Sequence, residues 1–111
     1  GKENLTTALD MAIIMEKIYN KSILSKKSCE IMIDILKRQR HRDKLPRYIV
    51  EDVVLANKTG ELTGANHDIG IFYLENLDYL IGVFTTDAKD DISGKRTIGK
   101  ISKLVYSNLM R

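Results

Sequence analysis

Apolar side chains recur at helical spacing in three segments, which predicts helices over residues 8–20, 26–38 and 94–108. A residue able to accept hydrogen bonds from free backbone N–H groups precedes each segment, and we expect the N-caps to be Thr7, Ser25 and Ser93. The apolar positions should be the core faces of these helices: Met11, Ile14, Met15 and Ile18 in the first, Cys29, Met32, Ile33 and Leu36 in the second, and Ile98, Ile101, Leu104 and Val105 in the third.

Three shorter segments between the second and third helices alternate as strands do, over residues 53–59, 67–74 and 79–86. The turns at 62–66 and 75–78 are short, so the strands should form an antiparallel meander. Both alternating faces of the last two strands are apolar, and we therefore expect the sheet to be covered on both sides. The predicted fold class is α+β, with two helices, a three-stranded antiparallel meander and a C-terminal helix.

Composition narrows the classes of function. The 111 residues suffice for one domain or part of one, and 43% hydrophobic with 30% charged residues is ordinary for a soluble chain. The net charge of +3 has mixed signs, which argues against dependence on nucleic acid. One cysteine and two histidines argue against a disulfide framework and against a metal site, and we expect no cofactor. No apolar run approaches the roughly 18 residues of a membrane span.

A basic segment, residues 37–47, has two interpretations. It could bind an anionic partner as a stand-alone module, in which case nucleic-acid affinity would depend steeply on salt. Alternatively it is a solvated helix end and connecting loop, since cations favour a helix C-terminus and Pro46 forces an extended segment. We favour the loop, because Tyr48 is its only aromatic neighbour and no helix-turn-helix or zinc spacing surrounds it.

The first predicted strand ends in Lys58-Thr59-Gly60, followed by Glu61. This sequence places a cation and a hydroxyl donor beside a backbone without a side chain, which suits a bound carboxylate or a developing oxyanion. Lys-Thr-Gly is also a signature of serine β-lactamases and penicillin-binding proteins. By itself the tripeptide is better explained as a strand end before a turn.

Longer segments extend the likeness: Asn4 to Ala12, Ala56 to Leu62, and His67 to Ile71. Together with the order of predicted elements, they make the whole of residues 1–111 resemble the C-terminal part of a class A β-lactamase. The resemblance implies that the α+β elements are part of the family's α/β/α sandwich. It also implies a location outside the cytoplasm, secreted or periplasmic.

By this resemblance, Lys58 and Thr59 would bind the substrate carboxylate, and Gly60 would let the substrate lie close to the strand. The backbone N–H of Glu61 would be one of two oxyanion donors. The family often places an arginine on the neighbouring strand or at the start of the final helix. Asn66 and His67 occupy the strand positions here, and Lys95 or Arg96 lies at the helical position. We take Arg96 as the candidate second cation and His67 as a candidate residue at the rim of the site.

The motifs Ser-x-x-Lys, Ser-Asp-Asn and Glu-x-x-Leu-Asn are not present in the chain. The resemblance therefore implies a serine hydrolase acting on β-lactams, of which this chain is an inactive part. A penicillin-binding DD-peptidase, acting on D-Ala-D-Ala-like molecules, is the alternative within the family. In the family the strand matching 79–86 pairs with N-terminal strands, so we expect its open edge here to join chains into a dimer or larger assembly, or else to cause aggregation. A monodisperse monomer in light scattering would contradict that expectation.

Overall fold

The structure, a computed structural model, describes residues 6–62, 64–86 and 90–111. The predicted order of elements is confirmed, and their ends differ from the expected ones by at most three residues. Residues 4–5 of the first resembling segment, residue 63 of the expected turn and residues 87–89 lie outside the described residues. The elements are α1 (Ala8–Tyr19), α2 (Lys26–Lys37), β1 (Val54–Leu62), β2 (Ala65–Tyr73), β3 (Asp78–Thr86) and α3 (Asp91–Leu109).

The three strands form an antiparallel sheet in the order β1-β2-β3. The β1–β2 pairing runs from Val54 opposite Tyr73 to Leu62 opposite Ala65, and Gly64 in the intervening turn has a φ of +78°, which favours glycine. In the described part of the chain, β1 and β3 therefore each have one edge without a strand partner. The expected pairing between chains along β3 stays a prediction.

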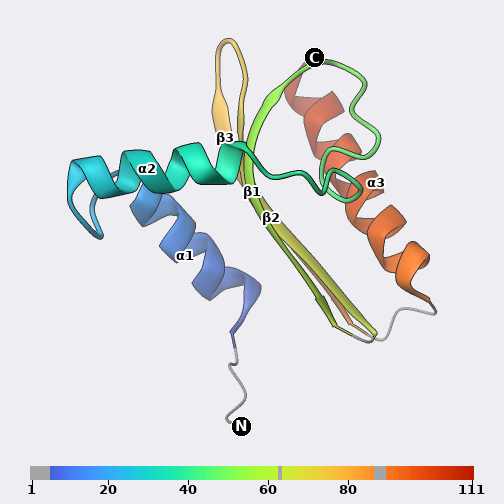
Figure 1. Ribbon diagram of the computed structural model, residues 1–111. Helices are drawn as coiled ribbons and strands as arrows, with labels where there is room; N and C mark the ends of the chain where they lie inside the picture. The colour runs from blue at the N-terminus through green and yellow to red at the C-terminus, as the bar shows by residue number, and fades with distance from the viewer. Residues whose placement is uncertain (1–5, 63, 87–89) are drawn as a thin grey trace, which may run out of the picture.

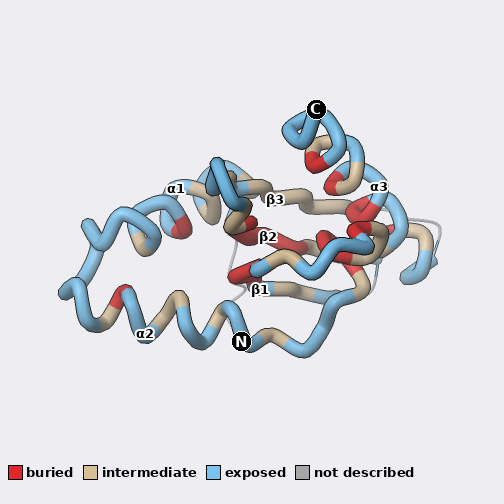
Figure 2. Tube along the Cα trace, turned by 90° about the horizontal axis from the view of Figure 1, so that it is seen from above, coloured by how far each residue is buried: buried red, intermediate tan, exposed pale blue. Residues whose placement is uncertain are grey.

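Helices cover both faces of the sheet, as expected. Figure 1 shows α3 on one side of the strands and α1 with α2 on the other. Neighbouring residues of β2 point to opposite faces, so Phe72 packs in the cluster with α3 while Ile71 packs against Met15 of α1. In Figure 2 the buried residues concentrate along β2 and on the inner side of α3.

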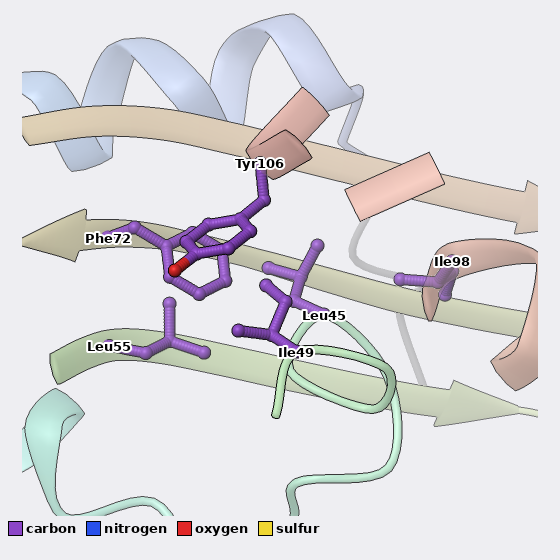
Figure 3. Packing of buried hydrophobic residues seen from close by; sticks show 6 residues of the cluster. All are labelled: Leu45, Ile49, Leu55, Phe72, Ile98 and Tyr106. Atoms are coloured by element: carbon purple, nitrogen blue, oxygen red, sulfur yellow. The ribbon is translucent and has the colours of Figure 1, made fainter. Parts of the chain in front are cut away.

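The core under α3 combines three parts of the chain (Figure 3). Leu55 and Phe72 come from the sheet, and Ile98 and Tyr106 come from α3. The remaining two, Leu45 and Ile49, belong to the connector between α2 and β1. The connector is therefore part of the fold that positions β1.

The prediction of a solvated basic connector was wrong for its second half. The first cations, Lys37 to Arg42, are exposed, but Lys44, Leu45 and Pro46 are buried. The physical reason is that Leu45 inserts into the core and its N–H donates to Asp68 Oδ2 at 3.0 Å, which draws the connector onto the sheet.

The predicted core faces of the helices are only partly right. Met15, Cys29 and Ile98 are buried, whereas Ile14, Ile101 and Leu104 are 41%, 39% and 65% exposed. In α3 the face toward the sheet contains two small residues, Gly99 and Ser102, between Ile98 and Tyr106. A Cβ at Gly99 would lie 2.9 Å from Tyr48 Cδ2, so close contact with the connector selects this face over the more apolar one.

Thr7 and Ser25 cap α1 and α2, accepting hydrogen bonds from Asp10 N and Ser28 N. The expected cap Ser93 of the last helix is wrong, because Asp90 is the N-cap of α3. The Asp90 carboxylate accepts from the Ser93 N–H at 2.6 Å. Ser93 is instead in the first turn, where its backbone is the donor that the cap satisfies.

Candidate functional site

The Lys-Thr-Gly sequence lies on β1, at the unpaired edge of the described sheet. Lys58 pairs with Ile69 and Gly60 with His67, so both project on the face toward α1 and α2. Side chains alternate along a strand, and Thr59 therefore projects on the α3 face. The cation and the hydroxyl consequently share no face of the sheet, and the feature common to them is the open edge of β1.

Backbone groups at this edge also alternate. In an antiparallel pair, one residue directs its N–H and C=O to the partner strand and the next directs both outward. Lys58 Nζ, which is exposed, donates to the carbonyl oxygen of Thr59. The ammonium thus lies beside the Thr59 carbonyl, at the edge of β1 that has no strand partner in the described sheet.

His67 lies opposite Gly60 in the register and is partly buried. Its ring stacks on Phe84, with 4.3 Å between ring centroids, and its buried Nδ1 has no hydrogen-bond partner in the described part of the chain. A Cβ added to Gly60 would come no closer than 3.7 Å to the His67 ring. The structure therefore places His67, on β2, directly beside the segment of β1 that contains Lys58 and Gly60.

Arg96 is exposed in the second turn of α3. Hydrogen bonds from Ser93 and, less, the charge of Arg96 hold the pKa of Asp90 below its usual range. The neighbouring Lys95 is the cation that reaches β1: its Nζ lies 3.4 Å from Glu61 Oε1. Of the two basic residues at the start of α3, the structure thus places Lys95 against the strand segment.

A charged cluster that the sequence reasoning missed lies behind Glu61, on the α3 face. Lys95 Nζ is 2.9 Å from Asp43 and 3.6 Å from Asp91 in addition to its contact with Glu61. Burial pushes the pKa of Asp43 upward, but the hydrogen bond and charge of Lys95 outweigh it and the pKa lies below its usual range. The hydrogen bond to Asp43 likewise raises the pKa of Lys95.

Lys44 is the buried member of this cluster. Its side chain is 0% exposed, and its Nζ lies 3.3 Å from Glu61 Oε1. It also donates to the carbonyl oxygens of Gly60, at 3.1 Å, and His67, at 3.3 Å. A buried lysine is uncommon unless its ammonium is fully paired, and these three partners satisfy its three N–H donors. Its burial also removes one cation from the basic segment that could serve an anionic partner.

A second buried polar group connects the connector to both strands. Asp68 on β2 is 0% exposed and accepts from Asn57 Nδ2 at 2.9 Å and from the Leu45 N–H at 3.0 Å. Burial raises the pKa of Asp68 to about 6, against the lowering effect of these hydrogen bonds and of Lys44. On the α3 side, hydrogen bonds therefore join β2 to the Asn57 side chain of β1 and to the connector.

A cleft of about 560 Å³ lies between α1, α2 and the strands, and the strands contribute Tyr73 and Asp78 to its lining. Tyr73 pairs with Val54, at the far end of β1 from Glu61. In the described ranges no group of three histidine, cysteine or acidic residues could hold a metal ion. The helices described are also too short or too polar to cross a membrane.

Comparisons with known proteins agree with this arrangement. A model of the beta-lactamase enzyme family (Beta-lactamase2) matches residues 1–109. Among curated protein sequences, none matches the chain.

This chain spans about two fifths of the length of the solved structures that it matches. A β-lactamase from Sphaerobacter thermophilus is 28% identical, with a TM-score of 0.91 over 96% of this chain and 41% of its own. PBP-A is 26% identical, with a TM-score of 0.86 over 95% of this chain and 40% of its own. A mutant of PBP-A was solved as an acyl-enzyme complex with penicillin G. A class A β-lactamase from Mycobacterium abscessus, at 19% identity and a TM-score of 0.79 over 96% of this chain and 42% of its own, shares the fold.

Proposed function

Because the chain belongs to the beta-lactamase enzyme family, we propose that residues 58–61 form one wall of a serine hydrolase active site. This chain is the C-terminal part of a class A β-lactamase-like domain, and the rest of the site comes from outside residues 1–111. The observation that carries the proposal is that Lys58, Thr59 and the Glu61 backbone meet at the unpaired edge of β1.

The wall binds the carboxylate of a β-lactam. The Lys58 ammonium supplies a charge and the Thr59 hydroxyl supplies a hydrogen bond, while Gly60 leaves room for the substrate along the strand. A charge-assisted hydrogen bond is worth more than a neutral one, which suits Lys58 for holding an anion. His67 lines the rim beside Gly60, and Arg96 stays a candidate second cation.

The wall also stabilises the charge that develops on the β-lactam carbonyl oxygen. A serine hydroxyl loses its proton and attacks the β-lactam carbonyl carbon. The C–N bond of the ring breaks and the ring nitrogen takes up a proton, which gives an acyl-serine ester that water then hydrolyses. The Glu61 N–H donates to the oxyanion, with the second donor on the nucleophile's own peptide. Residues 1–111 alone contain neither Ser-x-x-Lys nor Glu-x-x-Leu-Asn and are inactive by themselves.

A non-hydrolysing penicillin-binding protein is the second candidate, and the likeness to PBP-A favours it. Both candidates form the acyl-serine ester and use the same wall. They differ in how fast water attacks the ester, so the rate of deacylation separates them.

The test is acylation of the full-length protein by penicillin G, followed by mass spectrometry and by stopped-flow kinetics. Replacing Lys58 by alanine removes the charge-assisted bond to the carboxylate, and we expect the second-order acylation constant to fall by about 10- to 100-fold. The matched control is Lys100→Ala, which removes an exposed cation from α3 and should leave the constant unchanged. A wild-type protein that gains no penicillin mass, or equal constants in both variants, would sink the proposal.

A further inference from the structure

The peptide that joins Gly60 to Glu61 is contacted on its carbonyl side by a buried cation. Lys44 Nζ donates to the Gly60 oxygen at 3.1 Å and to the His67 oxygen at 3.3 Å. Gly60 and His67 are direct partners in the β1–β2 register. One ammonium can reach both oxygens only if they point toward each other, because in the other type of antiparallel pair both carbonyls point away from the partner. The Gly60 carbonyl therefore lies between β1 and β2.

The direction of the Glu61 N–H follows from the same peptide. No described peptide bond is cis, and in a trans peptide the N–H and the C=O point in opposite directions. The Gly60 C=O points toward β2, so the Glu61 N–H points away from β2, out of the open edge of β1. One end of this peptide thus contacts a cation, and the other end faces the edge where the substrate binds.

We propose that Lys44 is a positioning residue that orients and polarises the Gly60–Glu61 peptide, so that the Glu61 N–H becomes a stronger oxyanion donor. The inference rests on the proposed function. A cation bonded to a carbonyl oxygen draws electron density from the amide nitrogen, which makes the N–H at the other end of the same peptide more positive. Hydrogen bonds in such a chain strengthen one another, and burial from water increases the effect.

The surroundings of Lys44 fit this role better than a role in charge balance. Its ammonium is fully buried, contacts two backbone oxygens and has one carboxylate partner, Glu61. Lys95 contacts the same carboxylate, but its ion pairs are with three carboxylates, those of Asp43, Glu61 and Asp91. The two lysines share the charge and the Glu61 partner, and differ in the contact with Gly60. Lys95→Met is therefore the matched control for Lys44→Met.

The first measurement uses the acyl-enzyme of the full-length protein, formed with penicillin G that carries ¹³C at the lactam carbonyl. The infrared stretching band of the ester carbonyl falls as the oxyanion donors become stronger. We expect Lys44→Met to move this band to higher frequency and Lys95→Met to leave it in place. Lys44→Gln has a neutral N–H donor of similar length, and its band should lie between those of Lys44→Met and the wild type.

The kinetics should separate positioning from substrate binding. Loss of a whole oxyanion donor costs about 10²–10³ in kcat, so a weakened donor should cost roughly tenfold in the acylation rate constant. The Kd for penicillin G before acylation should stay unchanged, because Lys44 does not face the substrate. Circular dichroism and thermal melting check folding, and Lys44→Gln gives the test if Lys44→Met does not fold.

A second measurement needs no substrate. In the free full-length protein, the Glu61 amide proton resonance should shift upfield in Lys44→Met, by more than in Lys95→Met. An unchanged carbonyl band and amide resonance in Lys44→Met, or equal changes in the two variants, would overturn the role of Lys44 while the proposed function stands. A wild-type protein that forms no acyl-enzyme would overturn both.

Discussion

Two lysines lie at the same end of β1, and one is exposed while the other is buried. Lys58 is exposed at the open edge and donates to the backbone oxygen of its neighbour Thr59. Lys44 is 0% exposed, lies on the α3 face and bonds to the backbone oxygens of two paired strands. A ligand can therefore reach the side chain of Lys58, whereas the side chain of Lys44 is closed off from solvent.

The two faces of β1 differ in the same way, since one is closely packed and the other is open at Gly60. On the α3 face, Leu55 is in the core, Asn57 bonds to Asp68, and Glu61 pairs with Lys44 and Lys95. On the opposite side, an added atom at Gly60 would meet nothing closer than 3.7 Å. The strand is therefore held on its α3 face and is open at Gly60 on the other face, and one of its edges has no strand partner in the described sheet. The proposed site requires such an arrangement, because a binding site works best on a rigid element.

The largest effect should come from removing a core side chain on the α3 face. Phe72 is fully buried and stacks on Tyr79, with ring centroids 5.1 Å apart. We expect Phe72→Ala to lower the free energy of unfolding by about 3–5 kcal/mol, measured by urea titration. Lys58→Ala, in contrast, should change it by no more than about 0.5 kcal/mol while weakening acylation. Similar losses of stability in the two variants would contradict the division between a stabilising face and a binding edge.

Gly70 and Gly60 differ in the space available for an added side chain. A Cβ at Gly70 would lie 2.8 Å from Ala56 O and 2.8 Å from Asn57 Cβ, against the back of β1. Gly70→Ala should therefore cost about 1–3 kcal/mol of unfolding free energy, as overpacking does.

Gly60→Ala has space for its methyl group and should keep or slightly raise the unfolding free energy, by up to about 1 kcal/mol, through the less flexible unfolded chain. Its methyl group would stand beside the substrate, so we expect the Kd for penicillin G to rise. Urea titration and stopped-flow acylation of both variants make the comparison. Equal losses of stability would show that Gly60 on β1 is packed as tightly as Gly70 on β2.

Periodicity was enough to predict the elements, because each strand and helix has a local signal in the sequence. It was not enough to choose the buried face of α3, where Gly99 and Ser102 lie against the sheet side while Leu104 is 65% exposed. That choice depends on how closely Tyr48 approaches Gly99, which is a contact between segments far apart in the chain.

In the candidate site, too, some residues could be predicted from a local motif and others could not. Lys58, Thr59 and Gly60 are consecutive, so a motif could identify them. Lys44 is 16 positions from Gly60 and 23 from His67, in a segment rich in other cations, and composition alone favoured a solvated loop. The local signal that could have separated Lys44 from its neighbours is the apolar pair Leu45-Pro46 directly after it, which draws the connector into the core.

Asp68 tests how the stability of the α3 side depends on pH. Burial raises its pKa in the folded protein to about 6, whereas an unfolded aspartate titrates near 3.9. Below about pH 4 the carboxyl is protonated in both states, so its contribution to stability is fully present there. As the pH rises from about 4 through about 6, the unfolded state releases the proton more readily, and on the order of 3 kcal/mol of stability is lost.

Asp68→Asn should remove this dependence. The asparagine oxygen can accept from the Leu45 N–H, and its amide can donate to Asn57 Oδ1, which has no partner within the described part of the chain. We therefore expect urea titrations between pH 4 and 8 to give a flatter stability curve for Asp68→Asn than for the wild type. Asp52→Asn, which removes an exposed carboxylate, should keep the wild-type curve. If Asp68→Asn also kept it, the pKa of Asp68 would be the same in the folded and unfolded states, and its hydrogen bonds and Lys44 would offset the cost of burial.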